Sequence, residues 1–151
     1  MQISLFADYS FRLLIYLGNH PRRKVTVAEV AEVYDISRHH LVKVAHLLAK
    51  KNFVHSMRGK GGGLVLARSP DLIEIVDILR CCEKSLASLG HEALQDAGVT
   101  EHYPMKRMLL NATDSFFSCL EQYTLDDLLT PMAVAEDICH TAKLEQCKHE
   151  N

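Results

Sequence analysis

The chain has 151 residues, of which 48% are hydrophobic and 24% are charged, which fits one domain, or one domain with a helical extension. No run approaches the roughly 18 apolar residues of a membrane helix, and the first residues carry neither a basic leader nor a small-residue cleavage site, so we expect a cytoplasmic protein without a membrane partner. In that compartment the five cysteines are expected to be reduced thiols, metal ligands or redox switches, because structural disulfides are rare there.

The net charge of −2 hides an asymmetry between the two halves of the chain. Residues 1–68 carry 11 lysine or arginine residues and 4 acidic ones, a net of +7, whereas residues 69–151 carry 6 and 15, a net of −9. A basic first half joined to an acidic second half favours a polyanion partner for the first half alone. The alternative is an uneven surface without a function.

Apolar residues at mostly helical spacing predict a first helix over residues 3–17, ended by a glycine and a proline. A second, short helix is expected from Thr26 to about Tyr34. The string TVAE that opens it is a capping box, in which the Thr26 hydroxyl caps a free amide and Glu29 reaches back.

A third helix is expected after the turn Asp35-Ile36, with Ser37 as its N-cap and its end near residue 51. Its buried stripe is predicted to consist of Leu41, Val44, Leu47 and Leu48. Two short helices joined by a tight turn, with another helix before them, form the layout of a helix-turn-helix.

Two short strand-like runs, VHSM and LVLA, follow and are separated by RGKGGG. Glycines permit the positive backbone angles of a tight or bulged hairpin, so this segment predicts a basic wing. A phosphate-binding loop of a nucleotide enzyme is rejected, because Gly61 follows Lys60 where that motif needs a serine or threonine opening a helix. A purely structural glycine turn stays open.

The second half is predicted to be helical around a loop. A fourth helix is expected from Ser69-Pro70-Asp71 to Cys81-Cys82, with an apolar side formed by Leu72, Ile75, Val76 and Leu79. Pro104 suits the first turn of a long helix, whose apolar stripe is Met105, Met108, Leu109, Ala112, Phe116 and Leu120. The segment YTLDDLL predicts a short capped helix.

The predicted fold is mainly α with a small β-hairpin, a winged helix-turn-helix joined to a long dimerisation helix. We divide it into a DNA-binding domain (1–82), a loop (83–103), the long helix with its short successor (104–130) and a tail (131–151). The long helix needs a partner surface, either its own domain or a second copy. A homodimer would present two recognition helices to half-sites about 34–36 Å apart.

The residues expected to contact duplex DNA lie at the starts of the second and third helices and in the wing. They are Thr26, Ser37, Arg38, His39, His40, Val42, Lys43, Arg58, Lys60 and Gly61. Arginine and lysine reach guanine acceptors or phosphates, and valine offers a contact to a thymine methyl. Each basic side chain could instead be a solvated charge, and His40 could be partly buried beside Val44.

Five strings carry a family resemblance: FADYSFRLLIYL, VAEVAEVYDISRHHLVKV, VHSMRGKGGGLVL, IVDILR and YTLDDLL. Over about residues 1–130 the chain resembles the NsrR/IscR family of bacterial regulators, and the wing with its recognition helix carries the most specific match. Asp8 and the pattern SRxHxVK from Ser37 to Lys43 look closest to the nitric-oxide-sensing NsrR branch. The resemblance implies a winged-helix dimer that represses or activates promoters in nitric-oxide, redox or iron–sulfur stress.

The resemblance also implies an iron–sulfur cluster held by three loop cysteines spaced close to C-x5-C-x5-C. The matching loop, LGHEALQDAGVTEHYPMKRM, contains no cysteine. Glu92, Ala97 and Tyr103 fall at or near the cysteine positions, Lys106 stands where one branch has a histidine, and Asp8 is the one ligand position retained. Clusters need thiolates, or thiolates with imidazoles, and His91 and His102 are poor substitutes. The sequence therefore assigns no cofactor, and an iron–sulfur cluster stays open only through the resemblance, because its usual cysteine ligands are absent. A metal at Cys139, His140, Cys147 and His149 also stays open, although their spacing matches no strong pattern.

Two cysteines, Cys81 and Cys82, are candidate redox thiols near the junction of the wing domain and the long helix. They could equally be small buried hydrophobic residues. The sequence is also compatible with a regulator that a partner protein controls or that binds DNA constitutively, and with an interaction adaptor that no longer reads DNA. An enzyme is not expected, because no nucleophile–base–orienter set stands out and the nine histidines lack H-x-x-x-H spacing.

Overall fold

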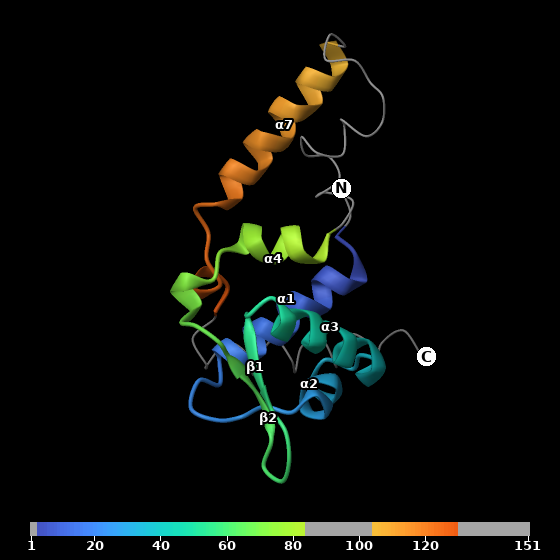
Figure 1. The fold of residues 1–151 in the computed structure, drawn as a ribbon, viewed down its shortest axis with the longest axis vertical. Coiled ribbons are helices and arrows are strands. Elements are labelled where there is room, and N and C mark those ends of the chain that lie inside the picture. The colour runs from blue at the N-terminus through green and yellow to red at the C-terminus, as the bar shows by residue number, and fades with distance from the viewer. Residues whose placement is uncertain (1–2, 84–103, 130–151) are drawn as a thin grey trace, which may run out of the picture.

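Three helices open the fold of the computed structural model, which describes residues 3–83 and 104–129. They are α1 (Leu5–Gly18), α2 (Val27–Val33) and α3 (Arg38–Lys50). A two-stranded hairpin follows, made of β1 (Val54–Met57) and β2 (Gly63–Leu66). The mainly helical fold with one hairpin confirms the predicted fold class (Figure 1).

The helix starts agree with the capping residues seen in the sequence. Ser4 precedes α1 and its hydroxyl accepts the Ala7 amide, and Thr26 precedes α2 and accepts the Glu29 amide at 3.1 Å. Ser37 is the N-cap of α3 in position, but its hydroxyl makes no capping hydrogen bond. Ser37 is exposed, and its hydroxyl lies at the start of α3, which is the predicted recognition helix.

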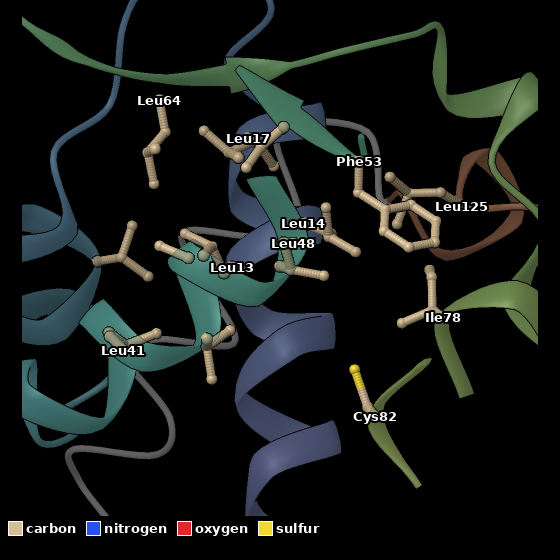
Figure 2. Packing of buried hydrophobic residues seen from close by; sticks show 14 of the residues in the cluster. Leu13, Leu14, Leu17, Leu41, Leu48, Phe53, Leu64, Ile78, Cys82 and Leu125 are labelled. Carbon is tan, nitrogen blue, oxygen red and sulfur yellow. The ribbon is translucent and has the colours of Figure 1, made fainter. Parts of the chain in front are cut away.

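The core lies where α1 crosses α3. Leu13 and Leu14 of α1 and Leu41 and Leu48 of α3 are fully buried and belong to one cluster (Figure 2). Burying a leucine side chain contributes about 1.5–3 kcal/mol, so this crossing fixes how the recognition helix is presented. Leu47, expected in the buried stripe, is only half-buried.

The hairpin is antiparallel, with Val54 opposite Leu66 and Met57 opposite Gly63. A third short segment joins it, because Val25 exchanges both backbone hydrogen bonds with Leu64, at 3.0 and 2.7 Å. The sequence indicated only two strands. We call residues 54–66 the wing and residues 58–62 the wing loop.

The expected continuous fourth helix is wrong at its start. A 3-10 turn, η1 (Pro70–Leu72), comes first, and α4 spans Ile75–Cys82. Ile73 lies between them in an extended conformation, and its carbonyl accepts the Leu125 amide at 2.7 Å. Leu72, expected on the buried side, is consequently 61% exposed.

The long helix α7 (Pro104–Leu120) projects away from the helices and hairpin of the first part (Figure 1). Its last turns reach α4, where Phe117 is buried and Arg80 lies over the Phe117 ring at 4.9 Å. Earlier in the helix, Met105, Met108 and Leu109 are about half to two-thirds exposed. Within the described residues, most of the predicted apolar stripe therefore has no partner.

A second 3-10 turn, η2 (Asp126–Leu128), follows α7. Asp127 accepts the Thr124 amide at 2.7 Å, which provides the predicted cap. Leu125 is fully buried and joins the core from the side of Phe53 and Ile78 (Figure 2). The predicted loop (83–103) and tail (131–151) lie outside the described residues, apart from Glu83, and no described helix is long and apolar enough to cross a membrane.

Candidate nucleic-acid interface

The starts of α2 and α3 meet the wing around a shallow, open depression of about 300 Å³. Three elements line it: Thr26, Val27 and Ala28 at the start of α2, Arg38 and Val42 on α3, and Ser56, Met57, Gly59, Gly62, Gly63 and Leu64 of the wing. Segments separated by up to 38 positions in the sequence thus form one concave surface. Of the ten predicted DNA contacts, Thr26, Arg38 and Val42 line it directly.

The first turns of α3 present a row of exposed polar and basic side chains. Arg38, His39, His40 and Lys43 are all exposed, and the apolar Val42 is 50% exposed among them. Because Leu41, Val44 and Leu48 point into the core, helical periodicity turns these positions outward. The surface therefore carries several hydrogen-bond donors around one apolar group.

The expectation that His40 could be partly buried beside Val44 is wrong. Val44 is fully buried, whereas His40 is exposed. The His40 ring lies 6.3 Å from the Tyr9 ring and 6.2 Å from the His39 ring, centroid to centroid. Both histidines thus stand on the outside of the helix start, and the His40 ring lies next to Tyr9 of α1.

The wing loop carries Arg58 and Lys60 at an exposed tip. Gly59 and Gly61 have φ angles of +97° and +78°, and the Gly62 amide donates to the Gly59 carbonyl at 2.9 Å. Glycine adopts positive φ without the steric cost of a side chain. The glycines therefore shape a loop that carries two cations beyond the strands.

An ion pair between Arg23 and Glu29 holds the segment before α2 in place. Glu29 accepts a hydrogen bond from the Tyr16 hydroxyl at 2.9 Å and from the Arg23 guanidinium at 2.5 Å. The bond from Arg23 lowers the pKa of Glu29 to about 2, with smaller contributions from Tyr16 and from the Thr26 amide. Burial, followed by the bond to Glu29, raises the pKa of Tyr16. Glu29 thus does more than close the capping box, because it also ties α2 to α1.

Eight of the eleven lining residues were not among the predicted contacts: Val27, Ala28, Ser56, Met57, Gly59, Gly62, Gly63 and Leu64. Ala28 could have been found, because a small exposed residue in the first turn after a cap is where a polyanion can approach closely. The strand positions depend on the hairpin register and on contact with Val25, and no local pattern reveals these.

The candidate redox thiols differ in their surroundings. Cys82 is 8% exposed, and its Sγ lies 3.2 Å from the Ser10 hydroxyl. Burial raises the pKa of Cys82 to about 11 and also raises the pKa of the half-buried Cys81. Since the thiolate is the reactive form, this environment favours a packing role. Cys119 on α7 is exposed.

The residues present do not fit an iron–sulfur cluster held as the resemblance implies. The sequence has no cysteine between Cys82 and Cys119, and clusters need thiolate donors. Across residues 3–83 and 104–129, no three histidine, cysteine or acidic side chains group as metal ligands. Asp8, the retained ligand position, is bonded to Arg12 at 2.9 Å. The second candidate constellation, of Cys139, His140, Cys147 and His149, lies outside the described residues.

Comparison with known proteins agrees with this architecture. Residues 3–131 match the family described as Rrf2, iron-dependent transcriptional regulator. Among solved structures, CymR of B. subtilis, named as its global cysteine regulator, is 27% identical with a TM-score of 0.68, over 85% of this chain and 95% of that one. T. potens IscR is 26% identical with a TM-score of 0.69, over 85% of each chain.

The oxidized form of Staphylococcus aureus CymR is 23% identical with a TM-score of 0.67, over 87% of this chain and 98% of that one, and supports the fold alone. The family match covers most of the chain, and the described fold has the winged-helix features that the sequence indicated. The chain belongs to the Rrf2 family and is a winged-helix, DNA-binding transcription regulator rather than an enzyme.

Proposed function

We propose that this protein binds a palindromic operator as a homodimer and acts as a repressor. The observation that carries the proposal is the depression at which Thr26, Arg38 and Val42 face the wing, with four exposed cations around it. These are Arg38, Lys43, Arg58 and Lys60. A recognition helix with basic flanks and a basic wing is suited to hold one duplex half-site.

Each side chain has a proposed role. Arg38 and Lys43 reach guanine acceptors or phosphates in the major groove, Val42 contacts a thymine methyl, and His39 and His40 donate to bases or phosphates. The free hydroxyl of Ser37 and the amides at the start of α3 take a phosphate. Arg58 and Lys60, with Gly61 allowing close approach, contact the adjacent minor groove or its phosphates.

The homodimer rests on α7. Its exposed Met105, Met108 and Leu109 form an apolar surface of the kind that marks protein interfaces. Pairing two such helices would cover it and place two recognition helices on one face of the DNA. A dimer bound across a promoter blocks transcription directly, and its site of action would be the cytoplasm.

The proposed signal is nitric-oxide, redox or iron–sulfur stress, which rests on the likeness of Asp8 and of the Ser37–Lys43 pattern to the NsrR branch. Because the usual cluster ligands are missing from the sequence, the sensing chemistry would differ from that of cluster-holding members. Oxidation of Cys81 or Cys82 is one route, and the protonated state that burial favours makes it slow. Treatment with diamide before a gel shift tests it, and unchanged affinity with all thiols oxidised would exclude it.

Selection of duplexes from a random pool by the full-length protein tests operator binding. Arg38→Ala is expected to lose about 1–3 kcal/mol of discrimination between selected and scrambled duplexes. Lys50→Ala is the matched control, because Lys50 is exposed at the other end of the same helix, about 18 Å along its axis. An interaction adaptor would enrich no sequence, bind without salt dependence and be unaffected by Arg38→Ala.

A further inference from the structure

Three consecutive basic residues, Arg22, Arg23 and Lys24, stand between α1 and α2 and are all exposed. The structure holds this segment in place at both ends. The Arg23 amide donates to the His20 carbonyl at 3.4 Å, and Val25 is bonded to Leu64 of the wing. The three charges are therefore carried on a fixed segment.

The three cations are not equivalent. Arg23 is bonded to Glu29 and lies 3.4 Å from the Tyr16 hydroxyl, so its charge is largely neutralised within the protein. Among the described residues, Lys24 makes no ion pair or side-chain hydrogen bond. Lys24 is thus an available charge next to an occupied one.

The direction of Lys24 follows from its neighbours. Val25 is fully buried and Thr26 has extended backbone angles, φ −90° and ψ 151°. Successive side chains of an extended segment point to opposite sides, so Lys24 and Thr26 lie on the side away from the core. Thr26 lines the proposed DNA-binding depression. Lys24 precedes Thr26 by two residues and points to the same side of the segment.

Contact with the wing also locates Lys24. A Cβ built on Gly63, which lines the depression, would lie 3.1 Å from the Cβ of Lys24 and 2.9 Å from the carbonyl oxygen of Val25. The segment therefore packs directly on the base of the wing, in a position that requires glycine there. Lys24 therefore borders the depression next to Gly63.

We infer that Lys24 binds a phosphate of the DNA backbone and extends the interface beyond the recognition helix and the wing loop. The inference rests on the proposed function, because it names a further contact with the same duplex. Arg23 acts differently, as a positioning residue that holds the segment through Glu29. The contact is to the sugar-phosphate chain, so it adds affinity and orientation without reading bases.

The test is the salt dependence of binding by the full-length protein, measured with a selected duplex and with a scrambled one between about 50 and 200 mM KCl. Losing one phosphate contact lowers the magnitude of the slope of log K against log salt by about 0.9. Lys24→Ala is expected to show this smaller slope on both duplexes. The fold-loss of affinity between the two salt concentrations should therefore be roughly threefold to fourfold smaller for the variant than for the wild type. Lys24→Arg should restore the slope, and Lys50→Ala should leave it unchanged.

Three results would overturn the inference. An unchanged slope for Lys24→Ala, while Arg38→Ala loses sequence discrimination, would reject the Lys24 contact and leave operator binding intact. A lower thermal midpoint with an unchanged slope would assign Lys24 to holding the wing. If the wild-type protein shows no salt-dependent binding at all, the proposed function fails, and the inference fails with it.

Discussion

The Tyr16 hydroxyl of α1 donates a hydrogen bond to Oε1 of Glu29 in α2 at 2.9 Å, and the same oxygen accepts the Arg23 guanidinium. One carboxylate oxygen thus joins the first helix, the basic segment and the start of the helix-turn-helix. Glu29 also donates its amide to the Thr26 hydroxyl. Loss of the carboxylate charge should therefore leave the position of Thr26 less firmly fixed.

Glu29→Gln is expected to lower stability near neutral pH by up to about 1 kcal/mol, since the pair with Arg23 is partly solvated. The folded-state pKa of Glu29, about 2, lies below its ordinary value of 4.5. The stabilisation is therefore fully present above the ordinary value and is lost as pH falls from about 5 towards 2. Urea midpoints of wild type and variant should differ at pH 7 and converge in acid.

Glu32→Gln is the control for that series, because Glu32 is exposed on the same helix and forms no ion pair with the described residues. Its urea midpoint should follow that of the wild type at every pH. A constant difference between wild type and Glu29→Gln down to pH 2 would contradict the assignment of the charge to this network.

Gly63→Ala should destabilise the wing. The added Cβ would lie 2.9 Å from the Val25 carbonyl oxygen, and overpacking of this kind typically costs about 1–3 kcal/mol. Without the close approach, replacing glycine by alanine would stabilise by about 0.4–1 kcal/mol through the unfolded chain, so the sign of the change is diagnostic. Thermal unfolding by circular dichroism measures it.

Gly61→Asn is the companion variant. Its φ of +78° lies near the left-handed region that asparagine tolerates, and nothing lies within 4 Å of a Cβ built there. Its melting temperature should stay close to that of the wild type. Equal losses in both variants would mean that glycine flexibility, and not contact with Val25, is what the wing requires.

Leu109→Glu is expected to weaken the proposed dimer at least about tenfold, or about 1.4 kcal/mol, because it places a charge in the exposed apolar stripe of α7. Leu109 is 47% exposed, so the fold should survive. Ser118→Glu adds the same charge nine residues on, half a turn around the helix. Sedimentation velocity at several concentrations should show dissociation for Leu109→Glu alone, and an unaffected dimer would place the interface elsewhere.

Alkylation by iodoacetamide should distinguish the cysteines. Cys119 is exposed, whereas burial raises the pKa of Cys82 to about 11, so little Cys82 thiolate exists at pH 8. Peptide mass spectrometry is expected to show Cys119 labelled first and Cys82 labelled only after addition of denaturant. If native Cys82 is labelled as fast as Cys119, the result would contradict this prediction and support a role for Cys82 as a redox switch.

The local sequence was a sound guide where neighbouring residues decide the structure. Thr26 caps α2, the glycines shape the wing loop, and the start of α3 turns its basic residues outward. It failed where distant segments meet. Ile73 reads as part of a helix, but its hydrogen bond to Leu125 holds it extended. Val25 reads as an isolated apolar residue, but it pairs with Leu64.

The same distinction separates the predicted from the missed site residues. Arg38 and Val42 follow from position in a helix-turn-helix. Met57, Gly63 and Lys24 depend on how the wing pairs with the segment before α2, and this packing leaves no periodic signal.

The segment after α7 packs back on the first part of the fold, and this packing determines which fragments of the protein can fold. Ile75 donates its amide to the Tyr123 carbonyl, Leu125 donates to Ile73, and the Leu125 side chain is fully buried among residues of the first 82. The unit that presents the recognition helix is therefore discontinuous in sequence. A fragment cut after residue 82 would lack a side chain from its interior, whereas adding residues 123–129 through a short flexible tether would refill that space.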